Sequence, residues 1–289
     1  MYLPDFEYFT PDSVEEACQL LLKYGPKAKA IAGGTDVLIK MKKELLATEI
    51  LVAIGQLSQL KKIEYVPGKG VVIGSGATHN EVQNAKVLHE KYLSVSEAAH
   101  QMANSQVRNL GTVGGNISNA VPSADLPPIL IALDTTVKIV GSKGERTLPL
   151  EDVFKGPNQT VLEHDELITE FVIPDNSFTG STYIKFGLRA SGALAVVGVA
   201  AAVKMESDII KDARIVLGAV SPVPVRAKQA ENFLKGKQAG EELFAEAGVI
   251  ASGECRPISD IRASAEYRKD MVRVFTQRAL QKAVNEGHV

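Results

Sequence analysis

Two glycine-rich segments constrain the folding of this chain more than any other feature. The first, Ala32-Gly33-Gly34-Thr35-Asp36, stands between an apolar strand expected at 29–32 and a helical pattern that carries Val37 and Met41. Because glycine has no Cβ, a ligand can approach this backbone closely, and a helix N-terminus offers unpaired N–H groups that suit a phosphate. A plain strand-to-helix turn, with Thr35 or Asp36 as the N-cap, is the alternative.

The second segment reads Asn109-Leu110-Gly111-Thr112-Val113-Gly114-Gly115-Asn116. Its glycine spacing is not GxGxxG after a strand, and a helical pattern precedes it, which disfavours a Rossmann nucleotide site. Its glycines, with Thr112 and Asn116, still offer backbone amides and polar side chains to a diphosphate. A surface loop over 109–119 is the alternative. Together the two segments predict a dinucleotide that lies between them, with both phosphates enclosed.

The remaining pattern predicts an α+β chain of two domains, as 289 residues would allow. A helix that begins at the N-cap Ser13 and ends at Gly25-Pro26 alternates with short strands over 1–56. A second α+β unit follows, and the polar stretch Pro174–Ser177 marks its end. Its strands are expected at 63–66, 71–74, 136–140 and 167–173, and its helices at 80–88 and 94–103. The last part has apolar runs at 181–186, 193–203 and 214–220, which predict an antiparallel sheet, and then helices near 226–234, 241–251 and 264–284.

Composition excludes several classes of protein. With 32 basic and 34 acidic residues, the chain lacks the positive excess expected of a nucleic-acid-binding or membrane-surface protein. The apolar run from Ala193 to Val203 has 11 residues, whereas a membrane-spanning helix needs about 20. The first residues lack the basic and apolar regions of a secretory signal, so we expect a cytoplasmic protein.

The cysteines and histidines suggest no metal site. Cys18 and Cys255 are far apart and belong to no CxxC motif, so thiols of this chain cannot form a zinc or iron–sulfur site, and Cys18, within a helical pattern, is expected in the core. The five histidines form no obvious constellation and are expected at the surface.

Four motifs in order carry a family resemblance: Ala-Gly-Gly-Thr-Asp at 32–36, Gly-Thr-Val-Gly-Gly-Asn-Ile at 111–117, Ser-Ala-Asp at 123–125, and Asp-Ile-Arg-Ala-Ser-Ala-Glu-Tyr-Arg at 260–268. The chain resembles, over essentially its whole length, the FAD-binding (medium) subunit of molybdenum hydroxylases, the xanthine dehydrogenase and carbon monoxide dehydrogenase family. The resemblance implies a two-subdomain FAD-binding domain of the vanillyl-alcohol-oxidase/MurB-like type at 1–176, with subdomains at about 1–56 and 57–176. A C-terminal α+β domain, an antiparallel sheet with helices, would occupy 177–289.

The resemblance also implies a set of cofactor-binding residues and no catalytic or metal-ligating ones. One side of the FAD pyrophosphate would be held by Ala32, Gly33, Gly34, Thr35 and Asp36, and the other by Gly111, Thr112, Gly114, Gly115 and Asn116. Asp125 would bind near the adenosine ribose, or else would only cap the helix before Pro127. Ile168 would pack near the isoalloxazine ring, or else belong to the core. Lys185 would stabilise negative charge on the reduced flavin, or else be a solvated strand lysine.

The implied function is electron transfer. FAD would accept electrons from 2Fe-2S clusters in a small iron–sulfur subunit, while a large subunit with a molybdopterin cofactor oxidises the substrate, in a dimer of heterotrimers. A stand-alone FAD-dependent oxidoreductase and a flavin-free scaffold subunit are the alternatives. The chain has no cysteine-rich insertion of the kind found in 4-hydroxybenzoyl-CoA reductases. Met102 stands where xanthine dehydrogenases have a phenylalanine that faces the flavin. The substrate stays open, as does the external acceptor, which could be NAD, a quinone, a ferredoxin or oxygen.

Overall fold

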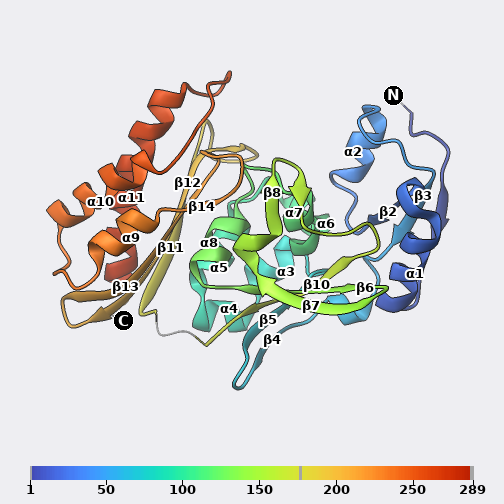
Figure 1. Ribbon diagram of the computed structural model, residues 1–289, viewed down its shortest axis with the longest axis horizontal. Coiled ribbons are helices and arrows are strands. Elements are labelled where there is room, and N and C mark those ends of the chain that lie inside the picture. Colours follow the sequence, from blue (N-terminus) through green and yellow to red (C-terminus); the bar gives the residue numbers. More distant parts are fainter. Residues whose placement is uncertain (1, 176–177, 287–289) are drawn as a thin grey trace.

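The computed structural model describes residues 2–175 and 178–286, in which three sheets follow one another along the chain (Figure 1). Asn176 and Ser177, where the predicted domain boundary falls, lie outside the described residues. We call the three parts the N-terminal unit, the middle unit and the C-terminal domain. No helix in the described ranges is long and apolar enough to cross a bilayer.

The N-terminal unit is a three-stranded parallel sheet in the order β1-β3-β2. Its elements are β1 (Glu7–Phe9), α1 (Val14–Tyr24), η1 (Gly25–Lys27), β2 (Ala28–Ile31), α2 (Val37–Lys42) and β3 (Ile50–Ala53). The prediction for α1 is confirmed, because the Ser13 hydroxyl accepts the N–H of Glu16 and Gly25, at φ +54°, ends the helix. Strand β1 was not predicted, since its three residues are mostly exposed and form no apolar run.

The middle unit is a five-stranded antiparallel sheet, in the order β4-β5-β10-β6-β7, with several short helices. Its strands are β4 (Ile63–Val66), β5 (Gly70–Gly74), β6 (Thr136–Gly141), β7 (Gly144–Pro149) and β10 (Leu167–Ile173), and β8 (Phe154–Gly156) pairs with β9 (Gln159–Thr160). The helices are η2 (Ser58–Leu60), α3 (His79–Asn84), α4 (Lys86–Lys91), α5 (Leu93–His100), α6 (Ser105–Leu110), α7 (Val113–Asn119), α8 (Leu126–Ala132) and η3 (Leu150–Val153).

Two predictions for the middle unit are wrong. The helix expected at 80–88 is divided into α3 and α4, because Ala85 has an extended backbone conformation. The segment expected as a loop over 109–119 is mostly helical. Thr112 caps α7 there by accepting the N–H of Gly115 at 3.1 Å. The sequence did not predict α7 because glycines stand in its first turn, and glycine is a poor helix former.

The C-terminal domain is a four-stranded antiparallel sheet with three helices on the side away from the middle unit (Figure 1). It contains β11 (Gly180–Gly187), β12 (Ala195–Glu206), β13 (Ile209–Gly218), β14 (Val225–Arg226), α9 (Lys228–Leu234), α10 (Glu241–Gly253) and α11 (Ala265–Glu286). The predicted antiparallel sheet is confirmed. Strand β13 begins five residues before the predicted start, because the polar pair Lys211-Asp212 interrupts its apolar run without ending the pairing with β12.

The middle unit and the C-terminal domain share one hydrophobic core. Tyr183, Ala200 and Val216 of the C-terminal sheet pack in the same cluster as the buried residues of α5 and α8. Gly198 allows this contact, since a Cβ there would lie 2.6 Å from the Tyr183 hydroxyl oxygen. The two parts are therefore packed as one body.

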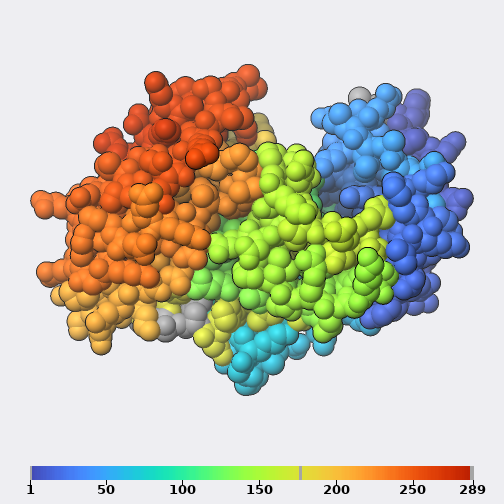
Figure 2. All heavy atoms as spheres, in the orientation of Figure 1, coloured from blue at the N-terminus to red at the C-terminus, as the bar shows by residue number. Residues whose placement is uncertain are grey.

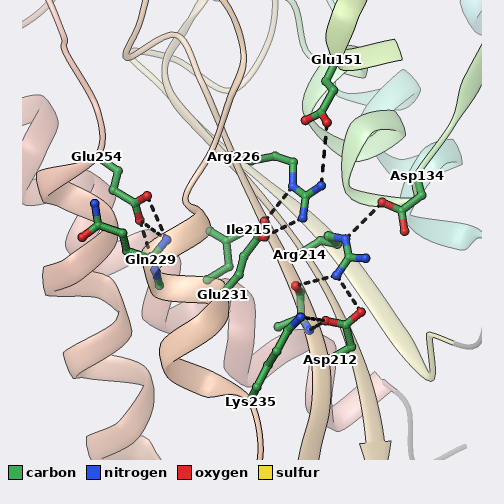
Figure 3. A network of polar contacts seen from close by, with 12 residues as sticks. Asp134, Glu151, Asp212, Arg214, Ile215, Arg226, Gln229, Glu231, Lys235 and Glu254 are labelled. Carbon is green, nitrogen blue, oxygen red and sulfur yellow. Dashed lines mark hydrogen bonds and ion pairs between the residues drawn. The ribbon is translucent and has the colours of Figure 1, made fainter. Parts of the chain in front are cut away.

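Ion pairs reinforce the same interface (Figure 3). Arg214 on β13 donates to Asp134, in the turn after α8, at 3.1 Å. Arg226 binds Glu231 at 2.6 Å within the C-terminal domain and lies 4.0 Å from Glu151 of η3. Both arginines are largely buried, so these contacts are less screened than exposed pairs.

The motif at 260–268 ties the connection between α10 and α11 to the sheet. Arg268, 1% exposed, donates to the carbonyls of Val196 at 2.7 Å and Ala219 at 3.2 Å, and to Asp260 at 2.8 Å. Asp260 also accepts hydrogen bonds from Arg262, and these bonds hold the pKa of its carboxyl well below its usual range. The motif thus has a structural role in this domain.

We expect Arg268→Met to lower the free energy of unfolding by about 2–4 kcal/mol, because two buried carbonyls and a carboxylate lose their donor. Denaturant titration of the purified chain measures this change. Arg278→Met, at an exposed position of the same helix, is the control. A change equal to that of the control would show that Arg268 contributes nothing to stability.

Candidate cofactor-binding site

A cavity of about 650 Å³ lies between the N-terminal unit, the helices of the middle unit and the β11–β12 loop. Figure 2 shows a notch in the surface between the N-terminal unit, in blue, and the middle unit, in green. Twelve of the residues predicted for the site line this one cavity: Ala32, Gly33, Gly34, Thr35, Asp36, Gly111, Thr112, Gly114, Gly115, Asn116, Asp125 and Ile168. Lys185 does not.

The two glycine-rich segments touch each other through their backbones. A Cβ on Gly33 would lie only 1.7 Å from the carbonyl oxygen of Leu110, so no other residue can stand there without separating the segments. Lys40 of α2 donates to Asn119 of α7 at 2.5 Å and joins the same two segments a second time. Gly33 is thus required by contact within the chain.

Gly114 has a similar explanation. Its N–H donates to the carbonyl of Ser75 at 2.8 Å, and a Cβ on Gly114 would lie 2.6 Å from the Ser75 Cβ. The sequence argument, in which these glycines leave room for a ligand, is therefore incomplete for Gly33 and Gly114. At Gly115 the space is freer, since a Cβ would meet only the Thr112 hydroxyl, at 3.1 Å.

Free hydrogen-bond donors gather on the first segment. At the start of α7 the N–H groups of Val113, Gly114 and Gly115 all have acceptors within the protein. In contrast, the N–H groups of residues 33–36 make no hydrogen bond within the described ranges, and Asp36 holds the N-cap position of α2 without a side-chain cap bond. Asp36 thus stands at the N-cap, as the alternative expected, but no side chain within the described ranges satisfies these N–H groups, and residues 33–36 line the cavity.

Two lysines add positive charge beside these donors. Lys29 of β2 and Lys40 of α2 both line the cavity. The surrounding protein lowers the pKa of Lys29, and the nearby charge of Lys40 lowers it further. Two cations and a row of unpaired N–H groups make this part of the cavity suited to a phosphate or another anion. The sequence analysis missed both lysines, although Lys29 stands three residues before the glycine-rich segment.

Other lining residues supply an acceptor and an apolar surface. The Oδ1 atom of Asn116 is buried without a hydrogen-bond partner, which is costly unless a ligand or water supplies one. Ile168 of β10 lines the cavity and also belongs to the core of the middle unit, as the core alternative expected, while its contact with a flavin ring stays a prediction. The residues present therefore fit a ligand that is anionic in one part and apolar in another.

Asp125, which lines the cavity, forms a buried group with Tyr183 and Lys185. Asp125 accepts from the Tyr183 hydroxyl at 2.9 Å and from Lys185 Nζ at 2.7 Å. Burial raises the pKa of Asp125, and the two donors offset part of that effect. The capping interpretation of Asp125 is wrong, because its side chain makes no bond to the α8 backbone. The solvated interpretation of Lys185 is also wrong, because its side chain is 9% exposed.

Lys185 lines a second, smaller pocket of about 350 Å³, together with Gln101 and Arg189. Its ammonium group is paired with Asp125, so the pair presents little net charge to the main cavity. The role expected for Lys185, stabilising a reduced flavin, stays a prediction.

His79 is a lining residue that the sequence analysis placed wrongly at the surface. It is 2% exposed, and burial with the nearby charge of Arg108 lowers its pKa to about 4. Its Nδ1 atom has no hydrogen-bond partner within the described ranges. The capping box of Thr78 and Glu81 was the available signal, since it makes His79 the first residue of a helix shortly after the buried strand β5. His288 lies outside the described residues, and the other three histidines are exposed.

Comparison with known proteins identifies the class. Residues 4–176 match the family described as the FAD binding domain in molybdopterin dehydrogenase, and residues 182–283 match the CO dehydrogenase flavoprotein C-terminal domain. The chain therefore belongs to the FAD-binding subunits of the molybdenum hydroxylase family, and it is an oxidoreductase subunit. The predicted fold class and family are confirmed.

Individual relatives match over nearly the whole chain. The carbon monoxide dehydrogenase medium chain of Hydrogenophaga pseudoflava is 34% identical, with 98% of each chain covered. The xanthine dehydrogenase FAD-binding subunit of Escherichia coli O157:H7 is 28% identical, with 91% of each covered. Among solved structures, the carbon monoxide dehydrogenase of Hydrogenophaga pseudoflava has a TM-score of 0.95 at 33% identity, with 99% of each chain covered. Quinoline 2-oxidoreductase of Pseudomonas putida 86 has a TM-score of 0.94 at 30% identity, with 100% of each covered.

We expect His79 to make the chain less stable in acid. The unfolded chain takes up a proton at His79 below about pH 6.5, whereas the folded chain resists it down to about pH 4, so stability falls as the pH falls through this window. His79→Gln should reduce the loss of unfolding free energy between pH 7 and pH 4.5 by about 2 kcal/mol.

Denaturant titration at both pH values measures the difference, with His100→Gln, at an exposed position, as the control. An unchanged pH dependence in His79→Gln would show that His79 does not resist protonation in the folded chain.

Proposed function

We propose that this chain is the flavoprotein subunit of a molybdenum hydroxylase complex, and that its bound FAD takes electrons from 2Fe-2S clusters of a partner subunit and passes them to an external acceptor. One observation carries the assignment of the site. A single cavity combines the N–H groups of residues 33–36 and the Asn116 Oδ1 atom, all without partners within the described residues, with the cations Lys29 and Lys40.

In this proposal the first glycine-rich segment is the main pyrophosphate site. Its N–H groups donate to phosphate oxygens, and Lys29 and Lys40 offset the negative charge. The second segment acts differently, since the first N–H groups of α7 already have acceptors. Asn116, Gly115 and the Thr112 region bound the ligand from the other side. FAD, when bound, supplies a ring that takes up and releases electrons, and the chain holds that ring and excludes water from it.

Asp125 and Ile168 keep their proposed places beside the ligand. Both oxygens of Asp125 already accept from Tyr183 and Lys185, so a ribose hydroxyl would add to an existing network. Ile168 offers an apolar contact for the flavin ring from β10.

The proposed partners are a small iron–sulfur subunit and a large molybdenum subunit, assembled as a dimer of heterotrimers. The name "medium chain" of three relatives, which match this chain over 96–98% of its length, supports a complex with smaller and larger subunits. We place the complex in the cytoplasm, since a chain of 289 residues with two cysteines suits a reducing compartment.

The first test of this function uses Gly33. Gly33→Ala forces the two glycine-rich segments apart, because its Cβ would overlap the Leu110 carbonyl oxygen, and we expect FAD affinity to fall at least about tenfold. Gly253→Ala, where a Cβ meets nothing within 4 Å, is the matched control. Fluorescence titration of flavin-free protein with FAD measures both. Wild-type protein that is folded but binds no FAD would overturn the proposed function.

The second test concerns the partners. Purification of the tagged chain from its native host should yield two further subunits, one with 2Fe-2S clusters and one with molybdenum, in equal amounts with this chain. Substrate added to the complex should bleach the visible absorption of the flavin. Turnover of substrate by the recombinant chain alone would contradict the proposal and favour a stand-alone oxidoreductase.

A further inference from the structure

The turn after α5 is held by three donors on three consecutive carbonyls. Lys185 Nζ donates to the carbonyl of Gln101 at 3.0 Å, and Arg108 Nη1 donates to that of Met102 at 2.9 Å. The N–H of Gly192 donates to the carbonyl of Ala103 at 3.0 Å. These donors come from β11, α6 and the β11–β12 loop, so three separate parts of the chain fix one turn.

The same turn contains backbone strain. Ala103 has φ +43°, in the left-handed region that residues with a Cβ rarely adopt. Such a conformation persists only where the surrounding structure enforces it, and it is enriched at ligand sites. The three donors provide that enforcement.

The turn forms part of the cavity wall. Met102 and Ala103 line the main cavity, together with Val107, Ala193 and Leu194, and they make this part of the lining apolar. The cations Lys29 and Lys40 belong to the N-terminal unit, whereas this wall is fixed by α6 and the C-terminal domain. Gln101 lines the smaller pocket, so the turn separates the two pockets.

Arg108 is the one of these three donors whose side chain binds only this turn, although its charge also lowers the pKa of His79. It does not line the cavity, and the one hydrogen bond of its side chain within the described ranges goes to the Met102 carbonyl. Its Nε atom is buried without an acceptor, so the residue bears a desolvation cost that its single bond must offset. Lys185, in contrast, also binds Asp125, and Gly192 donates through its backbone.

We propose that Arg108 is a positioning residue for the bound cofactor: it holds the Gln101–Ala103 turn in its strained conformation, so that Met102 and Ala103 form the apolar wall against which the planar ring of the cofactor lies. This inference rests on the proposed function, because it needs FAD in the main cavity. Arg108 acts through the turn and needs no contact with the cofactor.

The experiment is a double-mutant cycle between Arg108 and Ala103. Arg108→Met removes the donor, and Ala103→Gly removes the strain, because glycine adopts positive φ without a Cβ clash. Each variant is titrated with FAD, and the visible circular dichroism of its bound flavin is recorded as a signature of the ring's surroundings. Arg108→Lys tests whether a shorter donor rescues binding. Arg214→Met, which also removes an arginine bonded to a backbone carbonyl but lies in the interface network of Figure 3, is the control.

We expect Arg108→Met to weaken FAD binding about tenfold or more and to change the flavin dichroism, while Arg108→Lys and Arg214→Met keep the wild-type spectrum. Ala103→Gly should bind FAD like wild type and should restore most of the affinity lost in Arg108→Met.

Three results would overturn the inference. The first is a wild-type spectrum and affinity in Arg108→Met. The second is a loss that Ala103→Gly does not reduce, which would show that Arg108 acts by its charge or by general stability. The third concerns the thermal unfolding midpoint of the flavin-free proteins. The inference fails if this midpoint is well below that of Arg214→Met in Arg108→Met and does not rise again in the double variant. Failure of wild-type protein to bind FAD would instead count against the proposed function.

Discussion

The contact between Gly33 and the Leu110 carbonyl is the constraint on which the site depends. It brings together a parallel sheet and an antiparallel one, and the cavity exists because their connecting segments meet there without side chains between them. The remaining features follow from this approach. Lys40 can reach Asn119, residues 33–36 line the same cavity as Asn116, and Gly114 of α7 packs on Ser75.

The C-terminal domain contributes to the site mainly by holding its far wall. Its sheet shares a core with α5 and α8, and Tyr183 and Lys185 reach from that sheet to Asp125. Buried polar groups of this kind are costly when a partner is missing, so they specify one relative placement of the two parts. The cavity therefore has one wall set by backbone contact and another set by buried hydrogen bonds.

The sequence predicted the parts of this structure that depend on local pattern. The strands at 63–66 and 167–173, the helix after Ser13 and the two glycine-rich segments are all visible in residue spacing. It could not predict what depends on tertiary contact. Whether His79 is buried, whether Lys29 faces a cavity and which acceptor takes the N–H of Gly114 are decided by elements far away in the sequence. The glycines indicated where another group approaches the backbone closely. Only the structure shows that at Gly33 and Gly114 this group belongs to the chain itself.

The uneven distribution of donors between the two segments has a thermodynamic consequence. The N–H groups of residues 33–36, which have no acceptor within the described residues, and the lysines beside them belong to the N-terminal unit, while the partly buried wall opposite belongs to the rest of the molecule. A ligand that bridges them stabilises the association of these parts through its binding free energy. The stabilisation is about 2.7 kcal/mol when the free ligand concentration is a hundred times its dissociation constant. The placement of the N-terminal unit is thus linked to ligand concentration, and the ligand acts as an element of the tertiary structure as well as the carrier of its chemistry.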